Sequence, residues 1–243
     1  MEIVRTDIDD LPDDRLPSRP VKGRGAVSNE SGRYEPTRTE AVDDGWWRDE
    51  EDVPPLRTTV TVDSSRTIIA RNASPDVPFD RSVNPYRGCE HGCIYCFARP
   101  THAWLGLSPG LDFESRLFVK PDAARLLAME LSKPGYRPAV LAMGTNTDPY
   151  QPLERTRRIT RSVLEVLSAC NHPVAIVTKS ALICRDIDLL APMAEKRLAR
   201  AFISITTLDR ELARKLEPRA PTPAKRLAAI RALSRAGIPV GVM

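Results

Sequence analysis

The sequence has no long apolar run, no leader-like start and few cysteines, and each scarcity argues against a class of protein. No stretch approaches the roughly 20 apolar residues that a membrane helix needs. The first seven residues lack the basic start and apolar run of a signal peptide. The 243 residues include 5 cysteines, and nothing indicates secretion, so a disulfide framework is disfavoured. We therefore expect a cytoplasmic protein, monomeric and without a membrane partner.

Charge divides the chain into two parts. Residues 1–57 hold 9 basic and 15 acidic side chains, whereas residues 58–243 hold 27 basic and 17 acidic ones. Apart from the pair Trp46 and Trp47, the first part has almost no apolar periodicity, which is typical of disorder. We therefore predict a disordered acidic N-terminal tail at 1–57, a short β lead-in at 58–80 and a core at 81–243. The positive core permits an anionic substrate, although such charge more often reflects solvated helix faces.

Three of the five cysteines lie within eight positions, namely Cys89, Cys93 and Cys96, with the spacing C-x3-C-x2-C. Thiolates this close can bind one metal centre, and thiolate sulfur is the usual ligand of iron–sulfur clusters and of zinc. Three ligands leave one iron of a four-iron cluster open to a small molecule. Structural zinc instead takes a closed shell of four protein ligands, and His91 or His102 is the candidate fourth ligand.

From residue 82 onward, apolar runs of strand length alternate with amphipathic helical stretches, which predicts an α/β fold with a parallel sheet. The predicted strands are 58–62, 67–70, 82–84, 139–143, 174–178, 201–206 and 238–242. The predicted helices are 121–131, 153–169, 186–198 with a break near Pro192, 208–216, and one that begins at Thr222 and closes at Gly237.

The cysteine spacing, with Tyr95 as the aromatic residue before the third cysteine, resembles the signature of the radical S-adenosylmethionine (radical SAM) enzymes. The resemblance implies that Cys89, Cys93 and Cys96 bind a 4Fe–4S cluster whose open iron chelates the amino and carboxylate groups of S-adenosylmethionine. It also implies reductive cleavage of that cofactor to a 5′-deoxyadenosyl radical. A one-electron reductant such as flavodoxin or ferredoxin would be the partner, and Tyr95 and Phe97 would shield the cluster.

The same resemblance implies a partial (β/α)6 radical SAM barrel for the core. Cores of this family have six strands, whereas the sequence supplies about five and ends within the last of them. We therefore expect a core that is C-terminally incomplete, truncated after the fifth core strand.

A second motif, residues 144–152, follows the predicted strand 139–143 at the edge where barrel sites are built. It takes the place of the family's Gly-Gly-Glu motif. Together with residues 216–221, it resembles the spore photoproduct lyase-like branch, which is related to DNA repair photolyases. The resemblance implies that the following residues bind the amino group of the cofactor: Gly144, Thr145, Asn146, Thr147 and Asp148. The alternative for Asp148 is a capped loop in which it pairs with its own backbone.

Polar residues at the ends of later strands extend this cofactor site by the same resemblance. Lys179 ends one strand, and Ser204 and Thr206 end the next, where the family binds the ribose and carboxylate of the cofactor. Val240 and Gly241 would lie near the adenine.

The function expected from the sequence is that of a radical SAM enzyme which abstracts hydrogen from an unknown substrate, with nucleic acid as one candidate. Cys170 and Cys184 lie in apolar surroundings and are predicted to be buried free thiols, and neither matches a hydrogen donor. One alternative is a zinc-stabilised, non-catalytic nucleic-acid-binding protein, although no aromatic stacking platform is evident. The others are photoproduct lyase-type repair of DNA lesions as the specific activity, and a truncated, non-catalytic remnant.

Overall fold

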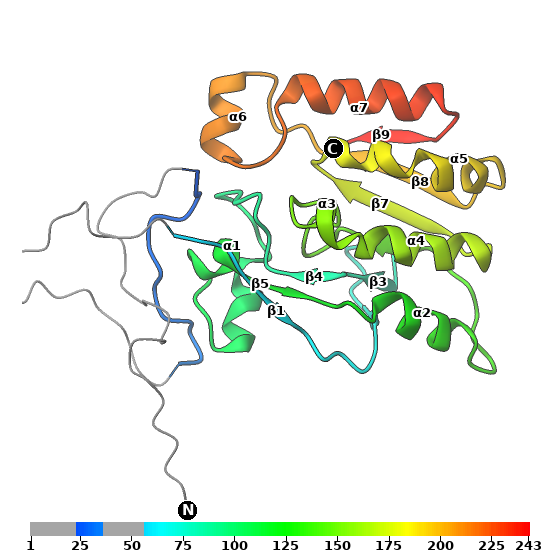
Figure 1. Cartoon of the computed structure of the whole chain (residues 1–243), viewed down its shortest axis with the longest axis horizontal. Coiled ribbons are helices and arrows are strands. Elements are labelled where there is room, and N and C mark those ends of the chain that lie inside the picture. Colours follow the sequence, from blue (N-terminus) through cyan, green and yellow to red (C-terminus); the bar gives the residue numbers. More distant parts are fainter. Residues whose placement is uncertain (1–22, 36–55) are drawn as a thin grey trace, which may run out of the picture.

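A six-stranded sheet forms the centre of the molecule, for which a computed structural model describes residues 23–35 and 56–243 (Figure 1). The strand order is β2 (Ile69–Arg71), β3 (Arg81–Val83), β6 (Leu141–Met143), β7 (Val174–Thr178), β8 (Ala199–Ile203) and β9 (Val240–Val242). The last five of these strands run parallel, and β2 is antiparallel to β3. The predicted α/β fold with a parallel sheet is therefore confirmed. Closure into a partial barrel and truncation after the fifth strand stay predictions.

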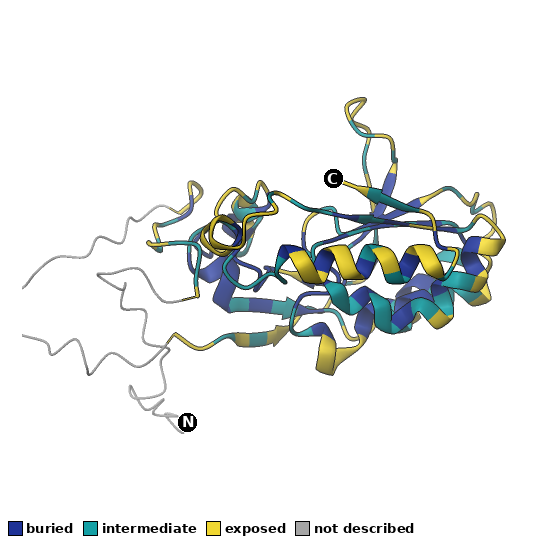
Figure 2. Cartoon of the chain, turned by 90° about the horizontal axis from the view of Figure 1, so that it is seen from above, coloured by how far each residue is buried: buried dark blue, intermediate teal, exposed yellow. Residues whose placement is uncertain are grey.

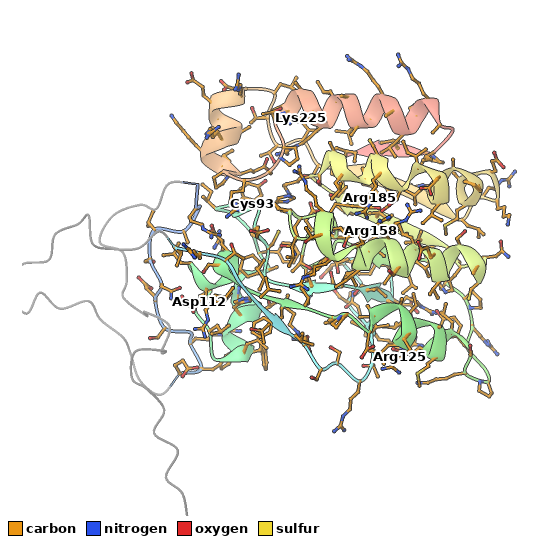
Figure 3. The ribbon with its side chains drawn as sticks, in the orientation of Figure 1. Cys93, Asp112, Arg125, Arg158, Arg185 and Lys225 are labelled. Atoms are coloured by element: carbon orange, nitrogen blue, oxygen red, sulfur yellow. The ribbon has the colours of Figure 1, made fainter. Side chains whose placement is uncertain are left out.

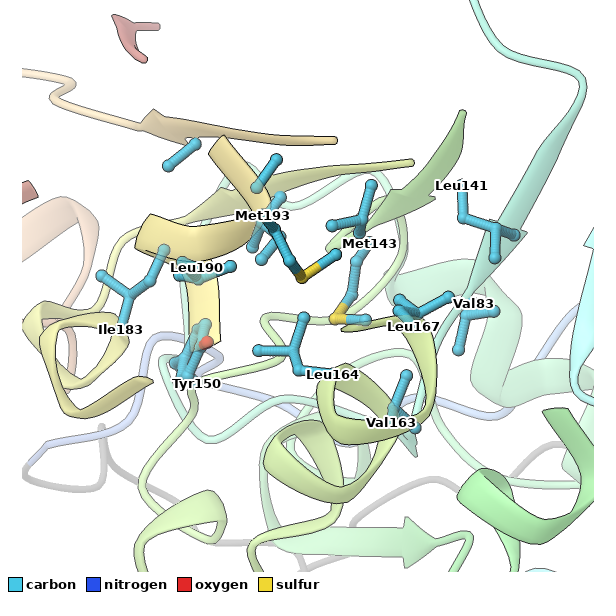
Figure 4. Close-up of a cluster of buried hydrophobic side chains, with 14 of the residues drawn as sticks. Val83, Leu141, Met143, Tyr150, Val163, Leu164, Leu167, Ile183, Leu190 and Met193 are labelled. Carbon is cyan, nitrogen blue, oxygen red and sulfur yellow. The ribbon is translucent and has the colours of Figure 1, made fainter. Parts of the chain in front are cut away.

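The sheet is held by apolar side chains that strands and helices bury between them. Leu141 and Met143 of β6 are fully buried and pack with Leu164 and Leu167 (Figure 4). Parallel strands are covered on their faces by crossover helices, which is why their sequences read as continuous apolar runs. Each such side chain contributes roughly 1.5–3 kcal/mol when fully buried.

The longer helices lie along one side of the large sheet, with their exposed faces turned to solvent (Figure 2). They are α2 (Ala123–Leu131), α4 (Ile159–Ala169), α5 (Ile187–Glu195) and α7 (Pro223–Arg235). Two short helices, α3 (Glu154–Arg157) and α6 (Arg210–Leu216), follow β6 and β8.

Two predicted helices differ in detail. The predicted helix 153–169 is divided because Arg158 adopts a left-handed conformation with φ of 53°. There the carboxylate of Glu154 accepts a 3.0 Å hydrogen bond from the backbone N–H of Thr160, satisfying a donor in the first turn of α4. Pro192 lies inside α5, and the helix continues past it to Glu195 without the predicted break.

A second, three-stranded sheet carries the loop that contains the cysteines. Its order is β1 (Thr59–Val62), β5 (Arg116–Val119) and β4 (Tyr86–Arg87). The chain leaves β4 directly into residues 88–97, here called the cysteine loop. It returns to β5 through the 3-10 helix η3 (Arg99–Leu105) and the short α1 (Asp112–Ser115). The predicted β lead-in therefore divides, with β1 in the small sheet and β2 at the edge of the large one.

Residues 23–35, here called the N-terminal strap, pack against this second sheet. The buried carboxylate of Glu114 accepts hydrogen bonds from the backbone N–H groups of Gly25 at 2.9 Å and Ala26 at 2.8 Å. Asn29 donates to Asp112 at 3.0 Å. The predicted disorder of 1–57 is therefore wrong for the strap, because carboxylates far away in sequence satisfy its backbone. The rest of the predicted tail, with Trp46 and Trp47, lies outside the described residues.

None of the helices in the two described segments is long and apolar enough to cross a bilayer.

Candidate functional site

The cysteine loop is tightly curved around its three thiols. Cys89 and Cys93 are buried and Cys96 is half-buried, and all three are free thiols. Gly88 and Gly92 have φ of +75° and +65°, a conformation that glycine adopts without strain. A Cβ on Gly88 would also lie 2.7 Å from Leu117, and one on Gly92 would lie 2.6 Å from the carboxylate of Glu114. Both glycines are therefore required by the curvature and by close packing.

The buried thiols are suited to binding a cation. Burial raises the pKa of the Cys89 thiol well above its ordinary value, and it raises the pKa of Cys93 to about 12. A thiol in such surroundings loses its proton readily only when a metal takes its place. Three soft sulfur donors in one short loop, two of them buried, fit an iron–sulfur cluster with one open iron.

Each of the two histidines proposed as a fourth zinc ligand has one ring nitrogen near another protein group. His91 Nδ1 lies 3.3 Å from Asp148 Oδ2, and His102 Nε2 lies 2.9 Å from the carbonyl of Arg116. Over residues 23–35 and 56–243, no group of three or more His, Cys, Asp or Glu side chains is gathered tightly enough to hold one metal ion. A four-iron cluster spreads its thiolates more widely than a single ion does. The geometry therefore gives the closed zinc site no support.

Gln151 holds the cysteine loop from the side of the main sheet. Its side chain is fully buried, donates to the carbonyl of Gly88 at 3.2 Å and accepts from the N–H of Glu90 at 3.0 Å. An amide is the side chain that can satisfy a backbone donor and a backbone acceptor together. Sequence reasoning missed this residue, and its place within the motif 144–152 was the only available signal.

Asp148 lies at the junction of the cysteine loop, the 144–152 loop and β7. Its carboxylate accepts hydrogen bonds from Thr178 Oγ1 at 2.6 Å and from the N–H of Lys179 at 2.7 Å. Burial acts to raise its pKa, but the facing His91 and these donors outweigh burial and lower the pKa to about 2. Both carboxylate oxygens therefore have protein partners, and Asp148 connects three segments of the site.

In the rest of the 144–152 loop, some side chains are buried and hydrogen-bonded to the protein, and others are exposed. Thr147 is buried and donates to the carbonyl of Tyr86 at 3.1 Å. Asn84 fixes Thr145 and Asn146 by hydrogen bonds of 3.1 Å each, and the Asn146 side chain is exposed. A Cβ on Gly144 would lie 2.0 Å from the carbonyl oxygen of Val177, so this position requires glycine for close approach to β7.

Residues 216–219 hold the cysteine loop from the opposite side. The N–H of Ile94 donates to the carbonyl of Leu216 at 3.0 Å, and the N–H of Arg219 donates to the carbonyl of His91 at 3.2 Å. The Arg219 side chain also forms a 3.0 Å ion pair with Glu90. The segment that resembles the photoproduct lyase branch is thus a direct support of the cysteine loop.

Glu217 is a buried carboxylate at the centre of this contact. It accepts hydrogen bonds from Arg226, from the hydroxyl of Tyr95 and from Thr206 Oγ1, the last at 2.6 Å. Burial acts to raise its pKa, but Arg226 and then the two hydroxyls outweigh burial, and the pKa is lowered. Glu217 therefore fixes Tyr95 of the cysteine motif to the end of β8. Sequence reasoning did not assign it.

The predicted cofactor residues at the strand ends lie on one rim. Lys179 follows β7, and its Nζ lies 5.8 Å from the ring centroid of Tyr95, while Ser204 and Thr206 follow the parallel neighbour β8. In the view of Figure 3, Cys93 lies between α6 and α1. Carboxyl ends of parallel strands meet at one edge, which explains why these residues come together.

Other expectations are not met. Phe97 is 78% exposed and Tyr95 is 48% exposed, so both aromatic rings present surface to solvent, and their shielding of the cluster stays a prediction. Cys170 is exposed and Cys184 is half-buried, so the prediction of two buried thiols is wrong. Cys170 follows the last residue of α4, where the buried face of that helix has ended.

Comparison with known proteins identifies the family. The radical SAM superfamily matches residues 83–243. An uncharacterized protein of Mycobacterium tuberculosis is 42% identical over 167 residues, which cover 69% of this chain and 49% of that protein. An uncharacterized protein of Methanocaldococcus jannaschii is 28% identical over 156 residues, which cover 64% of this chain and 56% of that protein. The chain thus spans about half the length of the curated relatives it matches.

Solved structures share the fold. A mutant of spore photoproduct lyase aligns with a TM-score of 0.51 and 20% identity, covering 75% of this chain and 50% of that one. Spore photoproduct lyase complexed with dinucleoside spore photoproduct aligns with a TM-score of 0.50 and 19% identity, covering 75% and 49%. The chain belongs to the radical SAM superfamily, an enzyme family that uses a 4Fe–4S cluster and S-adenosylmethionine.

Proposed function

We propose that Cys89, Cys93 and Cys96 hold a 4Fe–4S cluster in this chain and that the chain cleaves S-adenosylmethionine reductively. When bound, this pair of cofactors supplies a 5′-deoxyadenosyl radical that abstracts hydrogen from the substrate. The observation that carries the proposal is the cysteine loop itself. Two buried thiols and one half-buried thiol are held in the loop that follows β4, and supports meet this loop from three sides.

Exposure divides the predicted cofactor residues into two groups. The first group is exposed or half-exposed on the rim, and we propose that its members bind the polar groups of the cofactor. It consists of Thr145, Asn146, Lys179, Ser204 and Thr206. Lys179 carries the charge that suits a carboxylate.

The other predicted residues act by holding the loops in place. The side chains of Thr147 and Asp148 form hydrogen bonds with other parts of the protein, and Gly144 allows the 144–152 loop to approach β7. We therefore propose that these three residues position the loops, and that residues on the rim bind the amino group of the cofactor.

The substrate is proposed to include nucleic acid, and repair of a DNA lesion is one candidate activity. The support is the fold shared with spore photoproduct lyase, together with the resemblance of residues 144–152 and 216–221 to that branch. A flavodoxin or ferredoxin is the proposed electron donor, and the cytoplasm is the proposed compartment.

The proposal is tested by anaerobic reconstitution with iron and sulfide, reduction with dithionite and assay of 5′-deoxyadenosine formed from S-adenosylmethionine. We expect product from the unaltered chain and from Cys170→Ala, which changes an exposed thiol outside the loop. We expect none from Cys96→Ala, since loss of one of three ligands removes the cluster. Retention of a full cluster in Cys96→Ala would contradict the ligand assignment. A colourless protein with bound zinc would overturn the proposal.

A further inference from the structure

A polar pocket that opens to solvent, here called the cavity, lies outside the cysteine site, where the chain passes from the small sheet to the large one. Its volume is about 400 Å3, and residues 63–70, Arg87 and Lys120 line it. The walls are fixed by backbone hydrogen bonds. The N–H of Asp63 donates to the carbonyl of Val119 at 2.8 Å, and the N–H of Lys120 donates to the carbonyl of Pro85 at 3.1 Å. The cavity is therefore built from strand ends and is not an accident of one loop.

The lining carries more positive than negative charge. It includes three cationic side chains, of Arg66, Arg87 and Lys120, and one acidic side chain, of Asp63. Asp63 is already engaged, because it accepts from Arg87 Nε at 2.6 Å and from Ser65 Oγ at 3.0 Å. The contact through Nε leaves the two terminal nitrogens of Arg87 outside that ion pair.

Lys120 is placed unfavourably for a cation in the absence of an anion. Burial, and then the positive charge of Arg87, lower the pKa of Lys120, while Asp63 acts in the opposite direction. A bound anion would offset both effects. The same lining offers the hydroxyl groups of Ser64, Ser65 and Thr67 as neutral donors. Guanidinium, ammonium and hydroxyl donors together match the oxygens of a phosphate group.

The cavity is connected to the proposed radical site through a short stretch of chain. Ile69 in its lining pairs with Val83 at the carboxyl end of β3. From there the chain continues through Asn84, which holds Thr145 and Asn146, and through Arg87 to Cys89. The cavity and the cysteine loop are thus both joined to the carboxyl end of β3.

We propose that this cavity binds a phosphate group, and that its source is the phosphodiester backbone of a nucleic acid substrate. The identity of that substrate rests on the proposed function, but phosphate binding itself does not depend on radical chemistry. Phosphate contacts fix the position of a nucleic acid without reading its sequence, which suits a site outside the reacting centre.

The test measures binding of a fluorescent 12-nucleotide single strand to the reconstituted protein over a salt series. The altered protein combines Arg66→Gln with Lys120→Gln, and the matched control is Arg125→Gln, an exposed arginine on α2 (Figure 3). We expect the double variant to bind about ten-fold more weakly or worse. We also expect the magnitude of the slope of log affinity against log salt to fall by about 0.7, the amount that belongs to one phosphate contact on a single strand. The control should bind like the unaltered protein.

A second variant distinguishes loss of binding from loss of folding. Thr67→Glu adds a negative charge at an exposed position of the lining, and we expect weaker binding with an unchanged unfolding midpoint. If strand binding is unchanged but inorganic phosphate binds the unaltered protein and not the double variant, the phosphate site holds and its source is a free phosphate. If neither probe distinguishes the double variant from Arg125→Gln, the proposal is overturned. The absorbance of the cluster, recorded for every variant, separates this result from failure of the proposed radical chemistry.

Discussion

Glu217 combines a buried charge with three donors, so its protonation state matters for stability. Its pKa is lowered in the folded chain, which means that the folded state favours the carboxylate over the acid. The resulting stabilisation is complete above the unfolded pKa of about 4.3 and is lost as the pH falls through the folded pKa.

We predict that Glu217→Gln lowers the free energy of unfolding at pH 7 by about 3 kcal/mol, because Arg226 loses its buried partner. The difference between the unaltered protein and the variant should stay constant from pH 8 to pH 5 and shrink below about pH 4. Urea unfolding over this pH range measures it, with the exposed Glu195→Gln as control. A difference that grows on acidification would refute the assignment of charge to Glu217.

At the level of single residues, the sequence identified thiols but not their supports. Cys89, Cys93 and Cys96 follow from local spacing, which the fold does not alter. Gln151 and Glu217 act on groups 61 and 122 residues away in sequence, and no local pattern encodes such contacts.

The N-terminal strap packs against the cysteine loop and against Glu114, which lies beside that loop. The carboxylate of Glu114 accepts hydrogen bonds from two backbone N–H groups of the strap, and Gly25 packs directly on Gly92. A Cβ on Gly25 would lie 1.9 Å from the carbonyl oxygen of Gly92, a distance that the two backbones cannot accommodate.

We predict that Gly25→Ala detaches the strap and increases tryptic cleavage after Arg24 about ten-fold or more, since Arg24 otherwise donates to the carbonyl of Glu114. Mass spectrometry of a cleavage time course measures the rate. Val27→Ala, two residues away at a position 61% exposed, is the control and should cleave at the unaltered rate. Equal rates for Gly25→Ala and Val27→Ala would show that the strap does not depend on this contact.

Elements with strong apolar runs were predictable, and short or polar ones were not. The parallel strands β6 and β7 are buried runs, and the sequence placed them to within two residues. In contrast, β4 has two residues and β5 begins with a half-buried arginine, so neither has a period that can be recognised. The strap has no regular structure, and its order comes from carboxylates more than 80 residues away.

At the scale of the whole molecule, the cysteine loop connects segments that are otherwise distant. The strap meets it at Gly92, Gln151 meets it at Gly88 and Glu90, and residues 216–219 meet it at the backbones of His91 and Ile94. A cluster bound by this loop would therefore stabilise all three supports, because a ligand that binds only the folded loop stabilises whatever the folded loop contacts.

Removal of the cluster should accordingly loosen a defined set of segments. We predict that chelation of the reconstituted protein raises amide hydrogen exchange in the cysteine loop, in residues 24–28, near Gln151 and in residues 216–219. Exchange in α2 and α4 should stay unchanged, since their buried faces pack into the main core and not against the loop. Hydrogen exchange with and without cluster measures this, and Cys96→Ala without treatment should match the chelated protein. A rise confined to residues 88–97 would mean that the supports are rigid without the cluster. A uniform rise across α2 and α4 would mean that the cluster stabilises the entire fold and not the three supports in particular.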